Sequence, residues 1–254
     1  MAAIDTVTAI YPVQRKMIDI HTHLVYGVDD GSRSLEMSQE MLRQAVANGV
    51  KGICCTTHIR PGHRDFPFQT YMNHLEQLRD FLWQQGLEVQ LFTGCEIMYT
   101  SRAAEYARKG LLPTLGETDH LLIEFLPETP WGMIQHGVRE MGNAGFRIVV
   151  AHVERYSCLR EEFSWMEELK EMGCLLQMNA ETVLRSHGFL GDRWAKKALK
   201  TGMIDVVASD MHNITSRKPN MHEAREMLKR DYGNERAREL TEEVPERILR
   251  KRDS

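Results

Sequence analysis

The chain alternates between short, continuous apolar runs and longer stretches in which apolar residues recur every three or four positions. The short runs are rich in Leu and β-branched residues and do not alternate with polar residues. This pattern is typical of strands that are buried on both faces of a parallel sheet. The runs predict seven strands, at Met17–His21, Gly52–Thr57, Glu88–Gly94, His120–Phe125, Arg147–Ala151, Cys174–Asn179 and Ile204–Ser209.

The stretches between these runs have helical periodicity. In the first of them the apolar residues fall on one face, Ser34 stands at the position of an N-cap, and Gly49 follows where the helix should end. The predicted helices are Leu35–Ala47, Thr70–Gln85, Ser101–Lys109, Trp131–Asn143, Glu161–Met172, Asp192–Thr201 and Met221–Tyr232.

Seven strand–helix units in alternation predict a parallel sheet with right-handed crossovers. Seven units favour a closed barrel over an open sheet, and a length of 254 residues suits one large α/β barrel domain. We expect three parts: an N-terminal extension (residues 1–16), the barrel (residues 17–233) and a charged tail (residues 234–254). The tail contains Pro245 and is expected to form a surface helix with a frayed end.

Composition narrows the class of protein. No apolar run reaches 18 residues, and the N-terminus lacks the basic and apolar segments of a secretion signal, so we expect no membrane insertion. Five scattered cysteines without a paired Cys-x-x-Cys motif indicate reduced thiols and a cytoplasmic location. The net charge of -4 does not favour a broad nucleic-acid surface, and no nucleic-acid partner is expected.

Residue types that bind metals recur where the apolar runs end, and in α/β barrels the chemistry lies at those ends of the strands. His21 and His23 are two positions apart in extended chain, so their rings point to the same side and can share one ion. The further candidates at strand ends or in the following loops are Asp29, Asp30, His58, Glu96, Glu124, His152, Asp210 and His212. This mixture of imidazole and carboxylate suits Zn, Mn or Fe better than Ca or Mg.

Each candidate also has a simpler interpretation. Asp29 and Asp30 precede a glycine and can form an ordinary turn, and Glu124 can pair with a buried arginine instead of a metal. Arg155 and Arg217 follow ligand candidates closely, as phosphate-binding groups would, although either can form a surface salt bridge. The remaining histidines are expected mostly at the solvated surface: His63, His74, His120, His136, His187 and His222.

With these residues, the chain resembles the PHP (polymerase and histidinol phosphatase) superfamily. More narrowly, it is similar to the bacterial manganese-dependent protein-tyrosine phosphatases encoded with capsule and exopolysaccharide genes. The resemblance spans about residues 17 to 225 and is carried by Met17–His23, Gly27–Gly31, Ala151–Tyr156 and Ser209–Arg217. The chain departs from the family pattern at Thr57 and Ile59, which replace a Pro and a second His, and at Val153, which replaces a Pro.

The resemblance implies the PHP fold, a distorted seven-stranded (βα)7 TIM-like barrel, with two or three divalent transition-metal ions. Manganese is the first choice of metal, with Fe or Zn as alternatives. Arg155 and Arg217 are implied as phosphate-binding catalytic residues, and Asp210 and His212 as residues that assist the reaction as well as bind metal. The implied ligand sets are His21, His23, Glu96 and Asp210 for one ion, Glu96, Glu124 and His152 for a second, and His58, His212 and Asp30 rather than Asp29 for a third.

The implied activity is that of a phosphotyrosine-protein phosphatase in which a metal-activated hydroxide hydrolyses phosphate monoesters. The implied partner is a phosphotyrosine protein, in particular the tail of a tyrosine kinase of capsule or exopolysaccharide synthesis, and an oligomer is possible. One alternative is a PHP phosphoesterase acting on a small metabolite such as histidinol phosphate. Another is a non-catalytic PHP-like binding module, which the full ligand set disfavours. A metal-dependent amidohydrolase is disfavoured because no lysine stands at a strand end as a bridging ligand.

The segment from Cys54 to Arg60 satisfies the Cys-x5-Arg pattern of cysteine-dependent tyrosine phosphatases. In those enzymes the segment is a loop whose backbone N–H groups hold phosphate, and it usually contains glycine. Here Cys54 lies within a predicted strand and no glycine follows before Arg60. We therefore do not expect a cysteine nucleophile.

Overall fold

The computed structural model describes residues 17–63, 65–187 and 192–250. The predicted N-terminal extension, residues 1–16, and the last four residues of the predicted tail lie outside these ranges. None of the helices within them is long and apolar enough to cross a bilayer.

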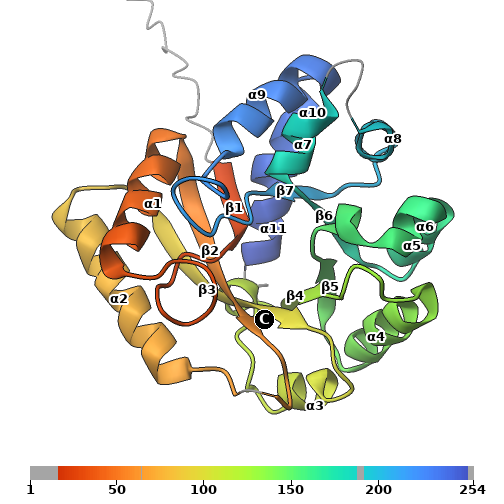
Figure 1. The fold of residues 1–254 in the computed structure, drawn as a ribbon, viewed down its shortest axis with the longest axis horizontal. Coiled ribbons are helices and arrows are strands. Elements are labelled where there is room, and N and C mark those ends of the chain that lie inside the picture. Colours follow the sequence, from red (N-terminus) through yellow and green to blue (C-terminus); the bar gives the residue numbers. More distant parts are fainter. Residues whose placement is uncertain (1–16, 64, 188–191, 251–254) are drawn as a thin grey trace, which may run out of the picture.

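Seven parallel strands form one sheet in the order of the sequence, curved into a nearly closed barrel with helices around it (Figure 1). This confirms the predicted TIM-like α/β fold, and each of the seven predicted strands is present. Their bounds are β1 Met17–Thr22, β2 Val50–Ile59, β3 Gln90–Met98, β4 His120–Glu124, β5 Arg147–Val150, β6 Leu175–Asn179 and β7 Val206–Ala208.

The barrel closes between β1 and β7 by only a few contacts. Backbone hydrogen bonds join Asp210 N to the His21 carbonyl (2.9 Å) and His23 N to the Met211 carbonyl (2.9 Å). Just before them, the buried carboxylate of Asp19 accepts a hydrogen bond from Ser209 N (3.0 Å). The Asp19 side chain thus accepts the hydrogen bond from Ser209 N that a backbone carbonyl would accept in a longer pair of strands.

The helices agree well with the periodicity, and the bounds of α1, α4 and α9 match the prediction to the residue. The predicted helix Glu161–Met172 is instead two short helices, α5 and α6, and α7 was not predicted because seven residues hold less than two full helical repeats. The α-helices are α1 Leu35–Ala47, α2 Phe68–Gln84, α3 Ala103–Arg108, α4 Trp131–Asn143, α5 Ser157–Glu161, α6 Ser164–Glu171, α7 Ala180–Ser186, α8 Arg193–Lys200, α9 Met221–Tyr232, α10 Asn234–Arg238 and α11 Val244–Leu249. Short 3₁₀ turns η1 (Leu115–Glu117) and η2 (Val153–Arg155) and a π-helical segment η3 (Glu239–Glu243) complete the order.

The segment after Gly233 is helical but does not lie as a surface helix, which corrects the prediction for the tail. Ile248 and Leu249 of α11 are buried and pack with Ile20, Leu115 and other side chains that fill the barrel interior. The Thr118 hydroxyl, just before β4, donates to the Ile248 carbonyl (3.0 Å). The tail therefore covers the N-terminal ends of the strands, opposite the end where the candidate ligands lie.

Candidate metal centre

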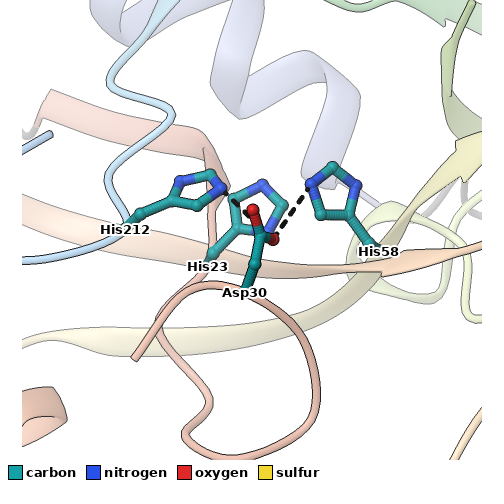
Figure 2. Close-up of side chains that lie close together, drawn as sticks. All are labelled: His23, Asp30, His58 and His212. Atoms are coloured by element: carbon teal, nitrogen blue, oxygen red, sulfur yellow. Dashed lines mark ion pairs between the residues drawn. The ribbon is translucent and has the colours of Figure 1, made fainter. Parts of the chain in front are cut away.

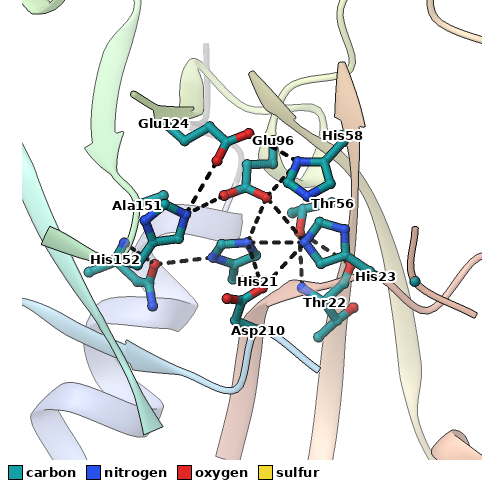
Figure 3. Close-up of polar contacts among 12 residues, drawn as sticks. His21, Thr22, His23, Thr56, His58, Glu96, Glu124, Ala151, His152 and Asp210 are labelled. Atoms are coloured by element: carbon teal, nitrogen blue, oxygen red, sulfur yellow. Dashed lines mark hydrogen bonds and ion pairs between the residues drawn. The ribbon is translucent and has the colours of Figure 1, made fainter. Parts of the chain in front are cut away.

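The predicted ligand side chains converge at the C-terminal ends of the strands. Because the strands are parallel, the C-terminal ends of β1 to β5 and β7 all lie at the same end of the barrel. The residues at these strand ends therefore meet there (Figure 3). Apart from His58, which is a third exposed, and the exposed Asp30, the predicted ligands are buried: His21, His23, Glu96, Glu124, His152, Asp210 and His212.

Glu96, near the end of β3, lies at the centre of this cluster. Its Oε2 atom is 3.1 Å from His21 Nε2, 3.1 Å from His23 Nε2 and 3.1 Å from His58 Nδ1. Its Oε1 atom is 2.8 Å from His152 Nε2 (Figure 3). One buried carboxylate therefore contacts four imidazole rings, which come from the ends of three strands, β1, β2 and β5.

The first implied ligand set is compact. His21 Nε2 and His23 Nε2 are 3.3 Å apart, and Asp210 Oδ1 lies 3.5 Å and 3.4 Å from them. With Glu96, these atoms form one of the groups close enough to hold a single ion. The i and i+2 spacing of the two histidines thus places both rings on the same side, as expected for extended chain.

His58 lies between the second and third implied sets. Its Nδ1 atom is 3.0 Å from Glu124 Oε1, and its Nε2 atom is 3.4 Å from Asp30 Oδ1. His152 Nε2 lies 3.5 Å from Glu124 Oε2. Glu124 therefore pairs with histidines and not with a buried arginine, and His58 faces both neighbouring sets.

The two adjacent aspartates of the β1–α1 loop have different surroundings. The side chain of Asp30 is 67% exposed and points at His58 and at His212 Nε2, 3.7 Å away (Figure 2). The side chain of Asp29 is 3% exposed; it hydrogen-bonds His23 Nδ1 (2.8 Å) and accepts from His58 N (3.0 Å) and Gly31 N (2.9 Å). Asp30 thus faces the open side of the cluster, while Asp29 holds the loop and a ring behind it.

Gly31 makes this loop possible. A Cβ at this position would lie 2.4 Å from both the Cβ and the carbonyl oxygen of His23, far inside van der Waals contact. Burial alone would raise the pKa of Asp29, but its hydrogen bond to His23 and the two backbone N–H donors lower the pKa to about 2.

Hydrogen bonds at the Nδ1 atom fix the tautomers of three of the histidines. His21 Nδ1 faces Gln177 Oε1 (3.1 Å), His23 Nδ1 faces Asp29, and His212 Nδ1 faces the Asp210 carbonyl (2.9 Å). Because these partners are oxygen acceptors, each Nδ1 donates its hydrogen to them, and each Nε2 faces the cluster, where it would present its lone pair to a bound cation. This is the arrangement that metal-binding histidines need.

The electrostatics of the cluster fit divalent cations. Within the described residues, Glu96 Oε2 and His212 Nε2 are buried and have no hydrogen-bond partner. Burial and the nearby charge of His23 lower the pKa of His212 to about 3, so its ring is neutral at pH 7. Buried carboxylates and imidazole lone pairs that face one another are stable only with positive charge between them. The donor set, nitrogen mixed with oxygen, is one that Mn, Fe or Zn accepts.

Both predicted arginines reach the same carboxylate. Arg155 Nη2 is 2.5 Å and Arg217 Nη2 is 2.6 Å from Asp210 Oδ2, and Asn179 Nδ2 donates to the same atom (2.8 Å). Asp210 (φ 53°) and His152 (φ 30°) have left-handed backbones, which are costly for residues other than glycine. These conformations occur just after β7 and β5, and both side chains point into the cluster.

Gln177 is a site residue that the sequence analysis missed. Its Oε1 atom accepts hydrogen bonds from His21 Nδ1 and from His152 N (2.8 Å), and its amide donates to Asn179 Oδ1 (2.8 Å). The available signal was a Gln two positions before Asn179 in a run that is otherwise apolar. A buried amide in such a strand needs polar partners, and here these are the ligands.

The structure also bears on two other expectations, a segment without a cysteine nucleophile and histidines at the surface. Cys54 is buried within β2 and its thiol donates to the Thr93 carbonyl (3.2 Å), and burial raises its pKa well above the usual range. A cysteine nucleophile at this position is therefore excluded, as expected. Among the histidines expected at the surface, His120 is an exception, because it is buried at the start of β4 beside Thr118.

Together, the barrel and the cluster at its mouth define a TIM-like metallohydrolase. Residues 17–250 match the family model described as "Capsular polysaccharide synthesis, CpsB/CapC". The chain belongs to this CpsB/CapC family.

Relatives and solved structures agree with this assignment. The chain is 35% identical over 239 residues to the tyrosine-protein phosphatase CpsB of Streptococcus pneumoniae, which covers 92% of this chain and 98% of the relative. It is 29% identical over 234 residues to the tyrosine-protein phosphatase YwqE of Bacillus subtilis, with 92% of each chain covered. A crystal structure from the work on YwqE and CpsB, described as unique metal-dependent tyrosine phosphatases, superposes with a TM-score of 0.83 at 29% identity, over 93% of this chain and 96% of the other.

A more distant structure shares the fold alone. The phosphotriesterase homology protein of Escherichia coli has a TM-score of 0.59 at 10% identity, over 93% of this chain and 99% of the other. The resemblance found in the sequence is thus confirmed: by family and by fold, the chain is a metal-dependent tyrosine-protein phosphatase.

Proposed function

We propose that the cluster at the barrel mouth is the catalytic site, where phosphotyrosine side chains of a protein are hydrolysed. The observation that carries this proposal is the contact of Glu96 with four imidazoles, which joins the ligand sets into one centre. The proposed ligands of two or three ions, Mn foremost, are His21, His23, Asp30, His58, Glu96, Glu124, His152, Asp210 and His212.

When bound, divalent cations supply a water that is activated near neutral pH and neutralise charge on phosphoryl oxygens. Arg155 and Arg217 bind the remaining phosphoryl oxygens, and Asp210 aims both guanidinium groups by accepting from each. Both arginine side chains are partly exposed (41% and 33%), so their outer N–H groups can reach a substrate.

The same contacts support the roles that we propose for Asp210 and His212. Burial would raise the pKa of Asp210, but the charge of His21 and hydrogen bonding hold it well below its usual value. His212 is neutral, and the single N–H group of its ring is at Nδ1, which faces the Asp210 carbonyl. Both therefore act as ligands and not as proton donors. A tyrosine phenolate, with a pKa of about 10, departs with only modest help from an acid.

The family description as capsular polysaccharide synthesis supports a substrate in that process. The proposed substrate is the phosphotyrosine tail of a bacterial tyrosine kinase. The five cysteines are all free and buried, which supports a cytoplasmic location.

The test measures hydrolysis of a phosphotyrosine peptide and of histidinol phosphate by the same preparations. Activity on the peptide should be lost with chelator, return with Mn²⁺, and fall about 100-fold in Arg155→Ala, because one oxyanion donor contributes a factor of roughly 10²–10³. His21→Ala should bind less metal and lose activity.

Cys54→Ser serves as the control, because its thiol is outside the site and should leave most activity. Full peptide hydrolysis after metal analysis shows a cation-free protein would contradict the proposal. Faster turnover of histidinol phosphate than of the peptide would favour a small-metabolite phosphoesterase instead.

A further inference from the structure

A cavity of about 420 Å³ adjoins the proposed catalytic site. It shares Arg155 and Asn179 with the site, where both of these side chains donate to Asp210 Oδ2. Its other lining residues are Glu154, Arg160, Glu181, Thr182, Arg185 and Asp192. Every lining residue is polar or charged, so the cavity offers little to an apolar side chain or an aromatic ring.

The wall next to Arg155 is firmly built. Glu154 is only 7% exposed. Its Oε1 atom accepts hydrogen bonds from Asn179 N (3.0 Å) and from the Thr182 hydroxyl (3.0 Å). Arg160 donates to the Glu154 carbonyl (3.3 Å). These contacts tie η2, which carries Arg155, to β6 and α7, so the cavity keeps a fixed position relative to the catalytic site.

Two further guanidinium groups of the cavity pair with carboxylates that solvent reaches, since the side chain of Asp192 is 26% exposed and that of Glu181 is 46% exposed. Arg160 of α5 pairs with Asp192 (3.0 Å) with its side chain 41% exposed, and Arg185 of α7 pairs with Glu181 with its side chain 72% exposed. Solvated ion pairs of this kind contribute little to stability. An anionic ligand can therefore replace the carboxylates at small cost and gain two-point hydrogen bonds from planar guanidinium groups.

We propose that this cavity, here called the flanking subsite, binds an anionic side chain of the phosphoprotein, close in sequence to the phosphotyrosine. The inference rests on the proposed function, since Arg155 connects the two sites. Arg155 lines both sites, and an extended peptide advances roughly 3.4 Å per residue, so we place the anion within about three residues of the phosphotyrosine. Its source is either the carboxylate of Asp or Glu or the phosphate of a second phosphotyrosine.

The experiment compares kcat/KM for matched peptides. Each contains one phosphotyrosine with Gln, Glu or a second, non-hydrolysable phosphotyrosine analogue placed in turn at the three positions on either side. At one or more positions, the wild-type protein should prefer an anionic peptide about tenfold over its Gln counterpart. The preference should fall below twofold in Arg160→Gln/Arg185→Gln, while turnover of p-nitrophenyl phosphate, which carries no second anionic group for the subsite, stays unchanged.

Arg43→Gln is the matched control. Arg43 is 46% exposed, pairs with Glu40 and lies over the ring of Phe81, much as Arg160 pairs with Asp192 and lies over Trp194. This variant should keep the wild-type preference. Which of the two anions gains identifies the source.

Equal kcat/KM for Gln and anionic peptides at every position, or a preference that survives in the double variant, would overturn the subsite. Failure of the proposed function has a different signature, because the wild-type protein would then not hydrolyse p-nitrophenyl phosphate in a metal-dependent way. Fluorescence anisotropy of labelled peptides would in that case still test the preference, by binding alone.

Discussion

At the scale of single residues, the groups behind the ligands are as specific as the ligands themselves. Gln177 fixes the His21 ring and the backbone at His152, and Asp29 fixes the His23 ring and the backbone at His58. These contacts decide which nitrogen of each ring faces the cluster. A ligand set can therefore be complete in sequence and still fail to bind if its supporting groups are changed.

Gln177→Met tests this role with a side chain of similar length whose sulfur is only a weak hydrogen-bond acceptor. We expect the affinity for Mn²⁺ to fall about 10- to 100-fold, as is typical when a supporting partner of a ligand is lost. Isothermal titration of the cation-free protein measures the change, and Gln44→Met on the outer helix α1 is the control. Unchanged affinity in a Gln177→Met protein with a native circular dichroism spectrum would contradict the role.

The sequence could supply the ligand candidates because each is a His, Asp or Glu at the end of a recognisable strand. It could not identify Gln177, whose contact with His21 spans 156 residues. Nor could it separate Asp29 from Asp30 by chemistry alone. The choice depends on the backbone of the loop, where Gly31 lets the chain approach His23.

At the scale of elements, strands and long helices were predictable because their patterns are local. All seven strands and the long helices follow from the spacing of apolar residues. The sequence did not predict how the barrel closes between β1 and β7 or that the tail is buried. Both features depend on contacts between distant parts of the chain. Asp19 and Ser209, which help to close the barrel, are 190 positions apart.

Asp19 also gives the closure a pH dependence. Burial raises its pKa to about 6 from 3.8, although the hydrogen bonds from Ser209 and His21 act in the other direction. Because the folded pKa is higher than the unfolded one, the native state binds the proton more tightly. The stabilisation is complete below about pH 4 and is lost as the pH rises through 6.

Asp19→Asn removes this titration while keeping an oxygen acceptor for Ser209 N. Relative to the wild-type protein, the variant should gain about 2 kcal/mol of unfolding free energy between pH 4.5 and pH 8, which corresponds to a shift of this size. Urea unfolding in chelator at the two pH values measures it, with the exposed Asp80→Asn as control. A difference from wild type that does not change with pH would refute the assignment.

At the scale of the whole molecule, the two ends of the barrel have different tasks. The N-terminal ends of the strands are covered by apolar side chains of the tail, including Val244 and Ile248. The C-terminal ends instead bury the carboxylates of Glu96, Glu124 and Asp210 among imidazoles. The first end stabilises the fold by burial, whereas the second needs bound cations to balance its charge.

Cation binding should therefore stabilise the whole barrel and not only activate it. At Mn²⁺ concentrations about 100-fold above the dissociation constant, binding contributes roughly 2.7 kcal/mol per site, which for a chain of this size raises Tm by about 5–10 °C. Differential scanning calorimetry with and without Mn²⁺ measures this rise. Glu96→Gln should lose most of it, because Glu96 contacts every proposed ion's ligands, whereas the exposed His222→Ala should retain it. An equal rise in Glu96→Gln would mean that the stabilising cations bind elsewhere than at the barrel mouth.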